Sequence, residues 1–66
     1  MAIKDNLKRI REENGLTQAQ VADVLEITRP AVTQWESGWS LPKMGHIEKL
    51  AELFGVSKAE ILGEKP

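Results

Sequence analysis

The sequence predicts an all-α domain of five short helices. Apolar residues recur every three or four positions, and no segment shows the sustained apolar and polar alternation of a strand. Turn residues divide the periodic stretches into short pieces. A chain of 66 residues is near the lower limit for folding on one core, so we expect a single domain over 1–66 with a flexible tail from about 63 to 66.

The first helix is predicted over residues 3–14. Its inner stripe has helical spacing and consists of Ile3, Leu7, Ile10 and Arg11. Gly15 directly after Asn14 is typical of a left-handed helix C-cap, because glycine has no side chain that clashes in that conformation. We therefore expect the first helix to end there.

The second helix is predicted to begin after Thr17. Gln20 stands three residues later and completes a capping-box pattern, in which each side chain accepts a hydrogen bond from the other residue's backbone N–H. The inner face of this helix is expected to comprise Val21, Ala22 and Leu25.

The third helix is predicted from near Thr28 to about Glu36. Pro30 suits a first helical turn, because its missing N–H would have no intrahelical partner there. With Thr28 as N-cap, Pro30 would be the second helical residue, and with Arg29 as N-cap it would be the first. The sequence leaves both choices open and favours a helix that starts at Arg29 or Pro30.

The fourth helix is predicted over residues 44–54, after a loop that contains Pro42 and before Gly55 as its stop. The only histidine, His46, is expected on its exposed first turn. The inward residues are expected to be Ile47, Leu50, Ala51 and Phe54.

A short fifth helix is predicted to follow and to end at Gly63. Ser57 and Glu60 form a second capping-box pattern at its start. This helix carries the apolar residues Ile61 and Leu62.

The composition excludes several kinds of site. The chain has no cysteine and one histidine, so disulfides and a thiolate metal site are excluded, and no structural zinc site is expected. No apolar run approaches the roughly 20 residues of a membrane-spanning helix. The first residues lack the apolar region of a secretory signal, so we expect a cytoplasmic protein with no membrane partner.

The charge balance argues mildly against a nucleic-acid partner. Nine Lys and Arg against ten Asp and Glu give a formal net charge of −1, whereas phosphate binding usually requires a basic excess. The acidic residues, however, concentrate late in the chain, and a single basic face can still steer a protein onto DNA. The basic residues of the first segment and around the third helix are Lys4, Lys8, Arg9, Arg11, Arg29 and Lys43.

The predicted third helix has two distinct faces. Val32 and Trp35 would face inward, and an outward stripe consists of Arg29, Pro30, Thr33 and Gln34. A helix fits the DNA major groove, where arginine can pair with guanine and glutamine with adenine. Two short helices joined by a tight turn, with such a stripe on the second, therefore indicate a unit that reads DNA.

Three motifs carry a resemblance to a known family: LKRIREENGLTQAQVA, ITRPAVTQWESG and LPKMGHIEKLAELFGVS. From about Leu7 to Leu62, the chain resembles the lambda-repressor-like helix-turn-helix family of phage repressors, Cro proteins and small bacterial regulators. Members usually have glycine in the turn between the two key helices, and this chain has Glu26 there. A left-handed residue with a side chain costs on the order of 1 kcal/mol, so the exact turn geometry is in doubt.

The resemblance implies a role for each part of the site. Gln18 is similar to a residue that binds a DNA phosphate while bracing the reading helix, and Arg11 with Glu36 matches a structural salt bridge. The positions expected to contact base edges are Arg29, Pro30, Thr33 and Gln34. Those expected to contact the phosphate backbone, together with Gln18, are Ser37, Trp39, Ser40 and Lys43.

Two tryptophans have different expected roles. Trp35 matches the buried tryptophan of the family. Trp39 lies in a loop and could cover the core, contact a phosphate or join a partner subunit.

The function implied is that of a sequence-specific transcriptional regulator, a repressor that binds a palindromic double-stranded operator as a dimer. The region of the fifth helix is rather polar, so we expect weak self-association in free solution. Two alternatives stay open: the DNA-binding part of a larger repressor, and a protein-binding module on the same fold, such as an antitoxin or a regulator's inhibitor. No enzymatic activity, cofactor or small-molecule substrate is expected, because the chain has no nucleophile beside a histidine and no phosphate-binding glycine loop.

Overall fold

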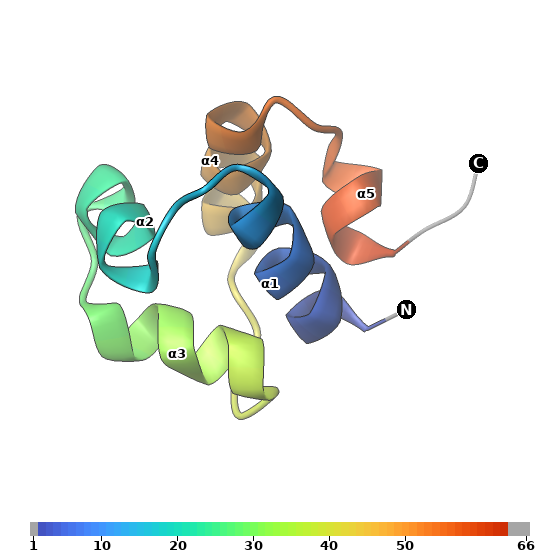
Figure 1. The fold of residues 1–66 in the computed structure, drawn as a ribbon. Helices are drawn as coiled ribbons and strands as arrows, with labels where there is room; N and C mark the ends of the chain where they lie inside the picture. The colour runs from blue at the N-terminus through green and yellow to red at the C-terminus, as the bar shows by residue number, and fades with distance from the viewer. Residues whose placement is uncertain (1, 64–66) are drawn as a thin grey trace.

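The computed structural model describes residues 2–63 and confirms the all-α class (Figure 1). Within these residues the chain forms five helices and no strand. Residues 64–66 of the expected tail lie outside the described range, and Gly63 caps the last helix. The helices are α1 (Ile3–Glu13), α2 (Gln18–Leu25), α3 (Arg29–Ser37), α4 (Met44–Phe54) and α5 (Lys58–Leu62).

Side-chain caps fix where two of the helices begin. The Thr17 hydroxyl accepts from the Gln20 N–H at 3.1 Å, and the Gln20 side chain accepts from the Thr17 N–H at 2.8 Å, which confirms the first capping box. At α5, the Ser57 hydroxyl accepts from the Glu60 N–H at 3.2 Å. The Glu60 side chain makes no reciprocal bond, so the second box is only half formed.

The start of α3 resolves the two choices left open by the sequence. Thr28 is the N-cap, so Arg29 is the first helical residue and Pro30 the second. The Thr28 side chain makes no capping bond, and its backbone carbonyl accepts from the Ala31 N–H at 3.1 Å instead. At its other end, α3 runs one residue beyond the expected Glu36, to Ser37.

The turn between α2 and α3 contains the one residue other than glycine with a positive φ among residues 2–63. Glu26 adopts φ 58° and ψ 42°, the left-handed conformation that caps α2. Its neighbour Ile27 donates its N–H to the Ala22 carbonyl at 2.9 Å, which closes the turn. The chain therefore makes this tight turn with a glutamate instead of a glycine at the left-handed position, at a cost in backbone strain.

The core lies where the five helices meet. Helix α1 packs against α3 on one side and α5 on the other, and α4 packs against α2 and α5 (Figure 1). Every residue predicted to face inward on α2 and α4 is buried, as are Val32 and Trp35 of α3. The buried apolar residues are Leu7, Ile10, Val21, Ala22, Leu25, Val32, Trp35, Ile47, Leu50, Ala51, Phe54 and Ile61.

One buried polar side chain was missed by the sequence reasoning. Asn6 is 2% exposed, and its Nδ2 donates to the Ile61 backbone carbonyl at 3.1 Å. This bond joins α1 to α5 within the core, where an unpaired carbonyl would be costly. The burial of Asn6 could have been predicted, because Asn6 lies beside Leu7 and one turn before Ile10 on the inner face of α1.

The expectation for His46 was wrong. The ring is partly buried rather than exposed, and it packs on Trp35 with ring centroids 5.2 Å apart. Its Nδ1 is buried without a hydrogen-bond partner. The reason is its place one turn before Leu50, which turns His46 toward the end of α3 instead of toward solvent.

Candidate nucleic-acid interface

Helices α2 and α3 form a helix-turn-helix unit whose outer face is polar. Val32 and Trp35 bury the inner side of α3 and hold it against the rest of the domain. The four predicted base-contacting residues are all exposed. They line one shallow surface depression together with Gln18 of α2, so the lining consists of Gln18, Arg29, Pro30, Thr33 and Gln34.

A salt bridge holds the end of α3 against α1, as the resemblance implied. Arg11 Nε donates to Glu36 Oε2 at 2.7 Å, and Arg11 Nη2 donates to Glu36 Oε1 at 3.0 Å. Arg11 Nη1 also donates to the Leu16 carbonyl at 2.8 Å. The hydrogen bonds that Arg11 donates to Glu36 raise the pKa of Arg11 above its ordinary value, against the opposing effect of burial. Arg11 therefore has a structural role, with its guanidinium hydrogen-bonded to groups of the protein itself.

Gln18 connects α2 to α3 through both ends of its amide. Its Oε1 accepts from the Thr33 hydroxyl at 2.8 Å, and its Nε2 donates to Glu36 Oε1 at 3.2 Å. The bracing role that the resemblance implied for Gln18 is therefore present in the geometry. Because an amide nitrogen carries two protons, one N–H of Gln18 is left for a partner outside the protein.

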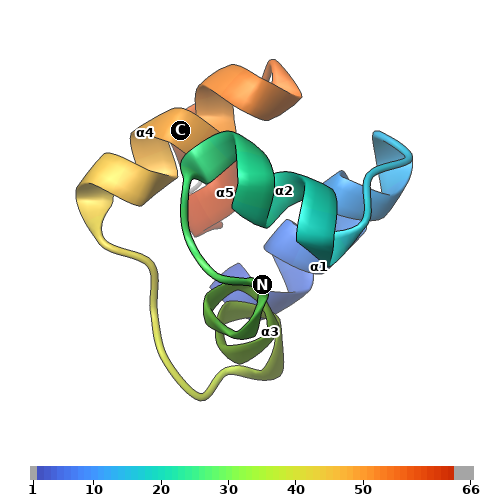
Figure 2. The ribbon, with the colours of Figure 1, turned by 90° about the vertical axis from the view of Figure 1, so that its left-hand side faces the viewer.

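The last residue of α3 and the loop after it contain four of the five expected phosphate-contacting residues. Ser37 Oγ donates to the Gln34 carbonyl at 3.0 Å and accepts from the Trp39 N–H at 3.3 Å, so this hydroxyl shapes the turn. Trp39 is 81% exposed, which excludes a role in covering the core. Ser40 is partly buried, and Lys43 is exposed at the N-cap of α4. Figure 2 shows α3 almost end-on, with this loop extending to one side of it.

Two exposed apolar residues in this region were missed. Leu41 is 68% and Met44 is 55% exposed, near the exposed Trp39 in the sequence. Both residues could have been noticed in the sequence, because Leu41 is a large apolar residue in a loop and Met44 is one at the very start of the next helix.

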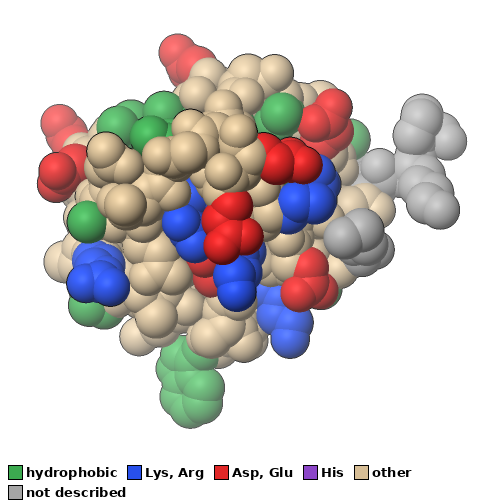
Figure 3. Space-filling view, in the orientation of Figure 1, with side chains coloured by type: hydrophobic (Ala, Val, Ile, Leu, Met, Phe, Trp, Pro, Cys, Tyr) green, Lys and Arg blue, Asp and Glu red, His purple; other side chains and the backbone are tan. Residues whose placement is uncertain are grey.

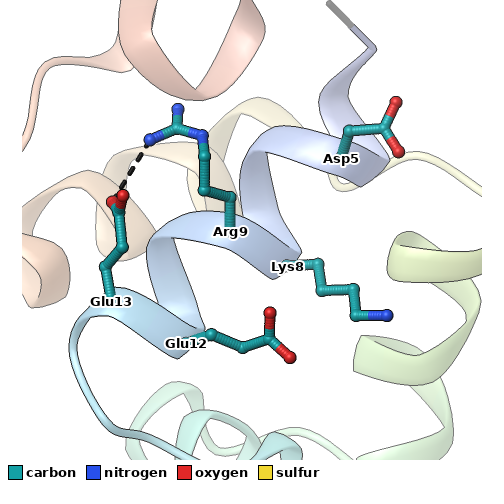
Figure 4. Close-up of a pocket in the computed structure, with 5 residues that line it drawn as sticks. All are labelled: Asp5, Lys8, Arg9, Glu12 and Glu13. Carbon is teal, nitrogen blue, oxygen red and sulfur yellow. Dashed lines mark hydrogen bonds and ion pairs between the residues drawn. The ribbon is translucent and has the colours of Figure 1, made fainter.

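The basic first segment does not form a uniformly basic face. Figure 4 shows five charged residues of α1 around one shallow pocket, with acidic and basic groups interleaved. Arg9 Nη1 forms an ion pair with Glu13 Oε1 at 3.2 Å, and Arg11 forms an ion pair with Glu36. Figure 3 shows the same mixture of signs across this face of the molecule. Of the expected cations, Arg29 lines the depression on α3 and Lys43 is exposed beyond it.

Among residues 2–63, no helix is long and apolar enough to cross a membrane. No three metal-ligating side chains of His, Cys, Asp or Glu come together within residues 2–63.

Sequence comparison shows similarity to known regulators. The profile of the helix-turn-helix family matches residues 7–61. The chain is 36% identical over 63 residues to the cryptic phage CTXphi transcriptional repressor RstR of Vibrio cholerae, covering 96% of this chain and 56% of that protein. It is 34% identical over 62 residues to the transcriptional activator BcrR of Enterococcus faecalis, covering 94% and 30%. The chain thus spans about a third to about half of these curated relatives.

Solved structures show the same fold. A transcriptional regulator from Listeria innocua superposes with a TM-score of 0.89 at 30% identity, covering 97% of this chain and 60% of that one. The P22 c2 repressor protein, crystallised in complex with a synthetic operator, also gives 0.89, at 17% identity and covering 98% of each chain. With its five helices, its left-handed turn at Glu26 and its family-profile match, the chain belongs to the helix-turn-helix family and has the lambda-repressor-like fold.

Proposed function

We propose that this chain is a sequence-specific DNA-binding unit of a transcriptional regulator, and that it represses by occupying an operator. The observation that carries the proposal is the shallow depression on α3. It gathers the Arg29 cation, a hydroxyl and two apolar surfaces on the exposed face of α3, together with two amides, Gln34 of α3 and Gln18 of α2. These groups are what a protein needs to read base edges in the major groove.

Each residue of the depression has a proposed task. Arg29, on the first turn of α3, pairs with guanine O6 and N7, and Gln34 pairs with adenine N6 and N7. Pro30 and the Thr33 methyl group contact a thymine methyl. Gln18 offers its remaining N–H to a phosphate at the edge of the groove.

The loop after α3 is proposed to follow the phosphate backbone. Ser37 is the last residue of α3, and Trp39, Ser40 and Lys43 lie between it and the start of α4. In these positions they can fix the protein's register on the duplex. Trp39 would donate its indole N–H and Lys43 its charge. These contacts contribute affinity without reading sequence.

The assembly on DNA is also a proposal. We infer that two copies of this domain bind a palindromic operator, with half-sites about one helical turn apart. Self-association in free solution is expected to be weak, because α5 exposes Lys58 and Glu60. The domain over 1–66 serves either alone or as the DNA-binding part of a larger repressor. A binding surface of this kind needs no catalytic group, cofactor or small-molecule substrate.

A second candidate function is a protein-binding module on the same fold. The exposed side chains of Trp39, Leu41 and Met44 favour it, since large apolar residues exposed close together in sequence can mark a protein contact. One relative, 32% identical over 62 residues and covering 94% of this chain and 39% of that protein, is the antitoxin PezA of Streptococcus pneumoniae.

Selection of binding sites from random DNA separates the two functions. The DNA-binding function predicts that one site with two-fold symmetry is enriched. The affinity for this site should fall steeply as the salt concentration rises. If no sequence is enriched, or if the logarithm of the binding constant hardly changes with salt, the phosphate contacts are absent and the protein-binding function is favoured.

A further inference from the structure

Four side chains form a chain of hydrogen bonds in which the donor and the acceptor of each bond are fixed. Arg11 and Gln18 both donate to Glu36, and Thr33, on the exposed face of α3, donates to Gln18. The direction decides which polar groups Thr33 and Gln18 present to a ligand. This inference rests on the proposed function and adds to it the kind of base that is read.

Glu36 sets the orientation of the Gln18 amide. The Glu36 side chain is 6% exposed, and Arg11 donates to both of its carboxylate oxygens. An ionised carboxylate only accepts hydrogen bonds, so the Gln18 group that faces it at 3.2 Å must be the Nε2 donor. A flipped amide would place two acceptor oxygens against each other.

The fixed amide places an acceptor beside the Thr33 hydroxyl. Gln18 Oε1 lies 2.8 Å from Thr33 Oγ1, and the backbone carbonyl of Arg29 lies 3.3 Å away. Both neighbours accept, and a hydroxyl has a single proton to donate. That proton is therefore used inside the protein, and the lone pairs and the methyl group of Thr33 are what face outward.

We propose that Thr33 reads its base as a hydrogen-bond acceptor, so that the base on the DNA strand nearest to it carries an amino group. In the major groove, adenine N6 and cytosine N4 donate, whereas guanine O6 and thymine O4 accept. Thr33 therefore selects adenine or cytosine over guanine or thymine at one position of each half-site, and the thymine whose methyl group it contacts lies at another position. Arg11 and Glu36 act as positioning residues that keep Gln18 from rotating and occupying the Thr33 oxygen.

The test compares base preferences of the wild-type chain, T33V and T33S, all measured on the site selected by the wild type. The wild type should prefer the amino bases at one position by about three- to ten-fold, the range expected for one hydrogen bond. T33V keeps the shape but has no acceptor, so it should lose this preference. T33S keeps the hydroxyl and should retain it.

The outcomes separate this inference from the proposed function. If the wild type selects a site and T33V leaves every base preference unchanged, Thr33 reads no amino group and the inference fails while the DNA-binding function stands. If T33V removes a preference for guanine or thymine instead, Thr33 donates its proton to DNA and the inference is also overturned. A wild type that selects no sequence overturns both.

A measurement on the free protein tests the hydrogen-bond direction without DNA. One of the two Gln18 Nε2 protons should exchange with water more slowly than the other in NMR spectra, because it is bonded to Glu36. E36Q should lessen this difference, and E52Q, which removes a charge from an exposed position on α4, should not. If both Gln18 protons exchange as fast as those of the exposed Gln34, the proposed chain does not form and the inference fails.

Discussion

Arg11 and Glu36 are 25 positions apart in the chain, yet they meet through two hydrogen bonds of 2.7 and 3.0 Å. The pair joins the end of α1 to the end of α3. Both side chains are mostly buried, with 12% and 6% exposed. The orientation of α3, the proposed reading helix, therefore depends on an ion pair on its inner side.

Arg11→Ala should lower the free energy of unfolding by about 3 kcal/mol, because it leaves the Glu36 carboxylate buried without its partner. The double variant Arg11→Met with Glu36→Leu should lose much less, since it removes both charges. Urea unfolding of the wild type, of Arg11→Ala and of the double variant gives the three free energies of unfolding. A double variant less stable than Arg11→Ala would contradict this account.

The contribution of Arg11 to stability should not change from neutral pH to about 10. Its folded pKa is raised above its ordinary value, so the stability from the charged form is fully present below that ordinary value. It is lost only as the pH rises through the higher folded value. The difference in unfolding free energy between wild type and Arg11→Ala, measured across this range, should therefore stay constant, and a steady decrease would contradict the assignment.

Arg29→Ala should weaken operator binding by about 1–3 kcal/mol and relax the preference at one base pair. Arg29 lines the depression on α3, where a guanidinium can reach a guanine edge. Arg9→Ala is the matched control, since it removes the same charge from the exposed face of α1. Equal weakening on every sequence would instead assign Arg29 to the phosphate backbone.

Lys43→Ala should weaken binding to all sequences alike and reduce the slope of log binding constant against log salt by about 1. Lys43 is exposed at the N-cap of α4, next to the loop proposed to follow the backbone. Lys49→Ala removes an exposed lysine from α4 and should change the slope little. An unchanged slope in Lys43→Ala would remove this residue from the interface.

Glu26→Gly should raise the free energy of unfolding by about 0.5–1 kcal/mol. Glycine adopts the left-handed conformation of this turn without strain, and the gain exceeds its greater loss of backbone entropy on folding. Glu26→Ala removes the same carboxylate but keeps a Cβ, so it should give no such gain. Thermal unfolding of both variants checks the prediction, and equal stabilisation by alanine would point to charge rather than backbone strain.

Local sequence patterns were sufficient for the fold and for the exposed face of α3. The Thr17 capping box and the burial of Val32 and Trp35 depend on neighbours within a few residues, and both were predicted. The geometry of the turn at Glu26 was left in doubt by the sequence, and the structure places this residue in the left-handed conformation. Whether the exposed residues contact DNA remains a prediction.

The rest depends on which helices meet in space. Asn6 is buried because α5 offers it a carbonyl, and periodicity within α1 cannot reveal that partner. The direction of the Gln18 bonds similarly depends on distances among three helices. Leu41 was passed over because a loop has no period to judge it against, and the exposure of Met44 was passed over because it is the first residue of α4.

The opposite environments of the two tryptophans supply the chain with two built-in fluorescence reporters. Trp35 is 5% exposed and packs on His46, so its emission should report the loss of tertiary packing on unfolding. Trp39 is 81% exposed and is itself a proposed phosphate contact, so its emission should respond to DNA. These are the only tryptophans in the sequence, and single Trp→Phe variants would let folding and binding be followed separately without an added dye.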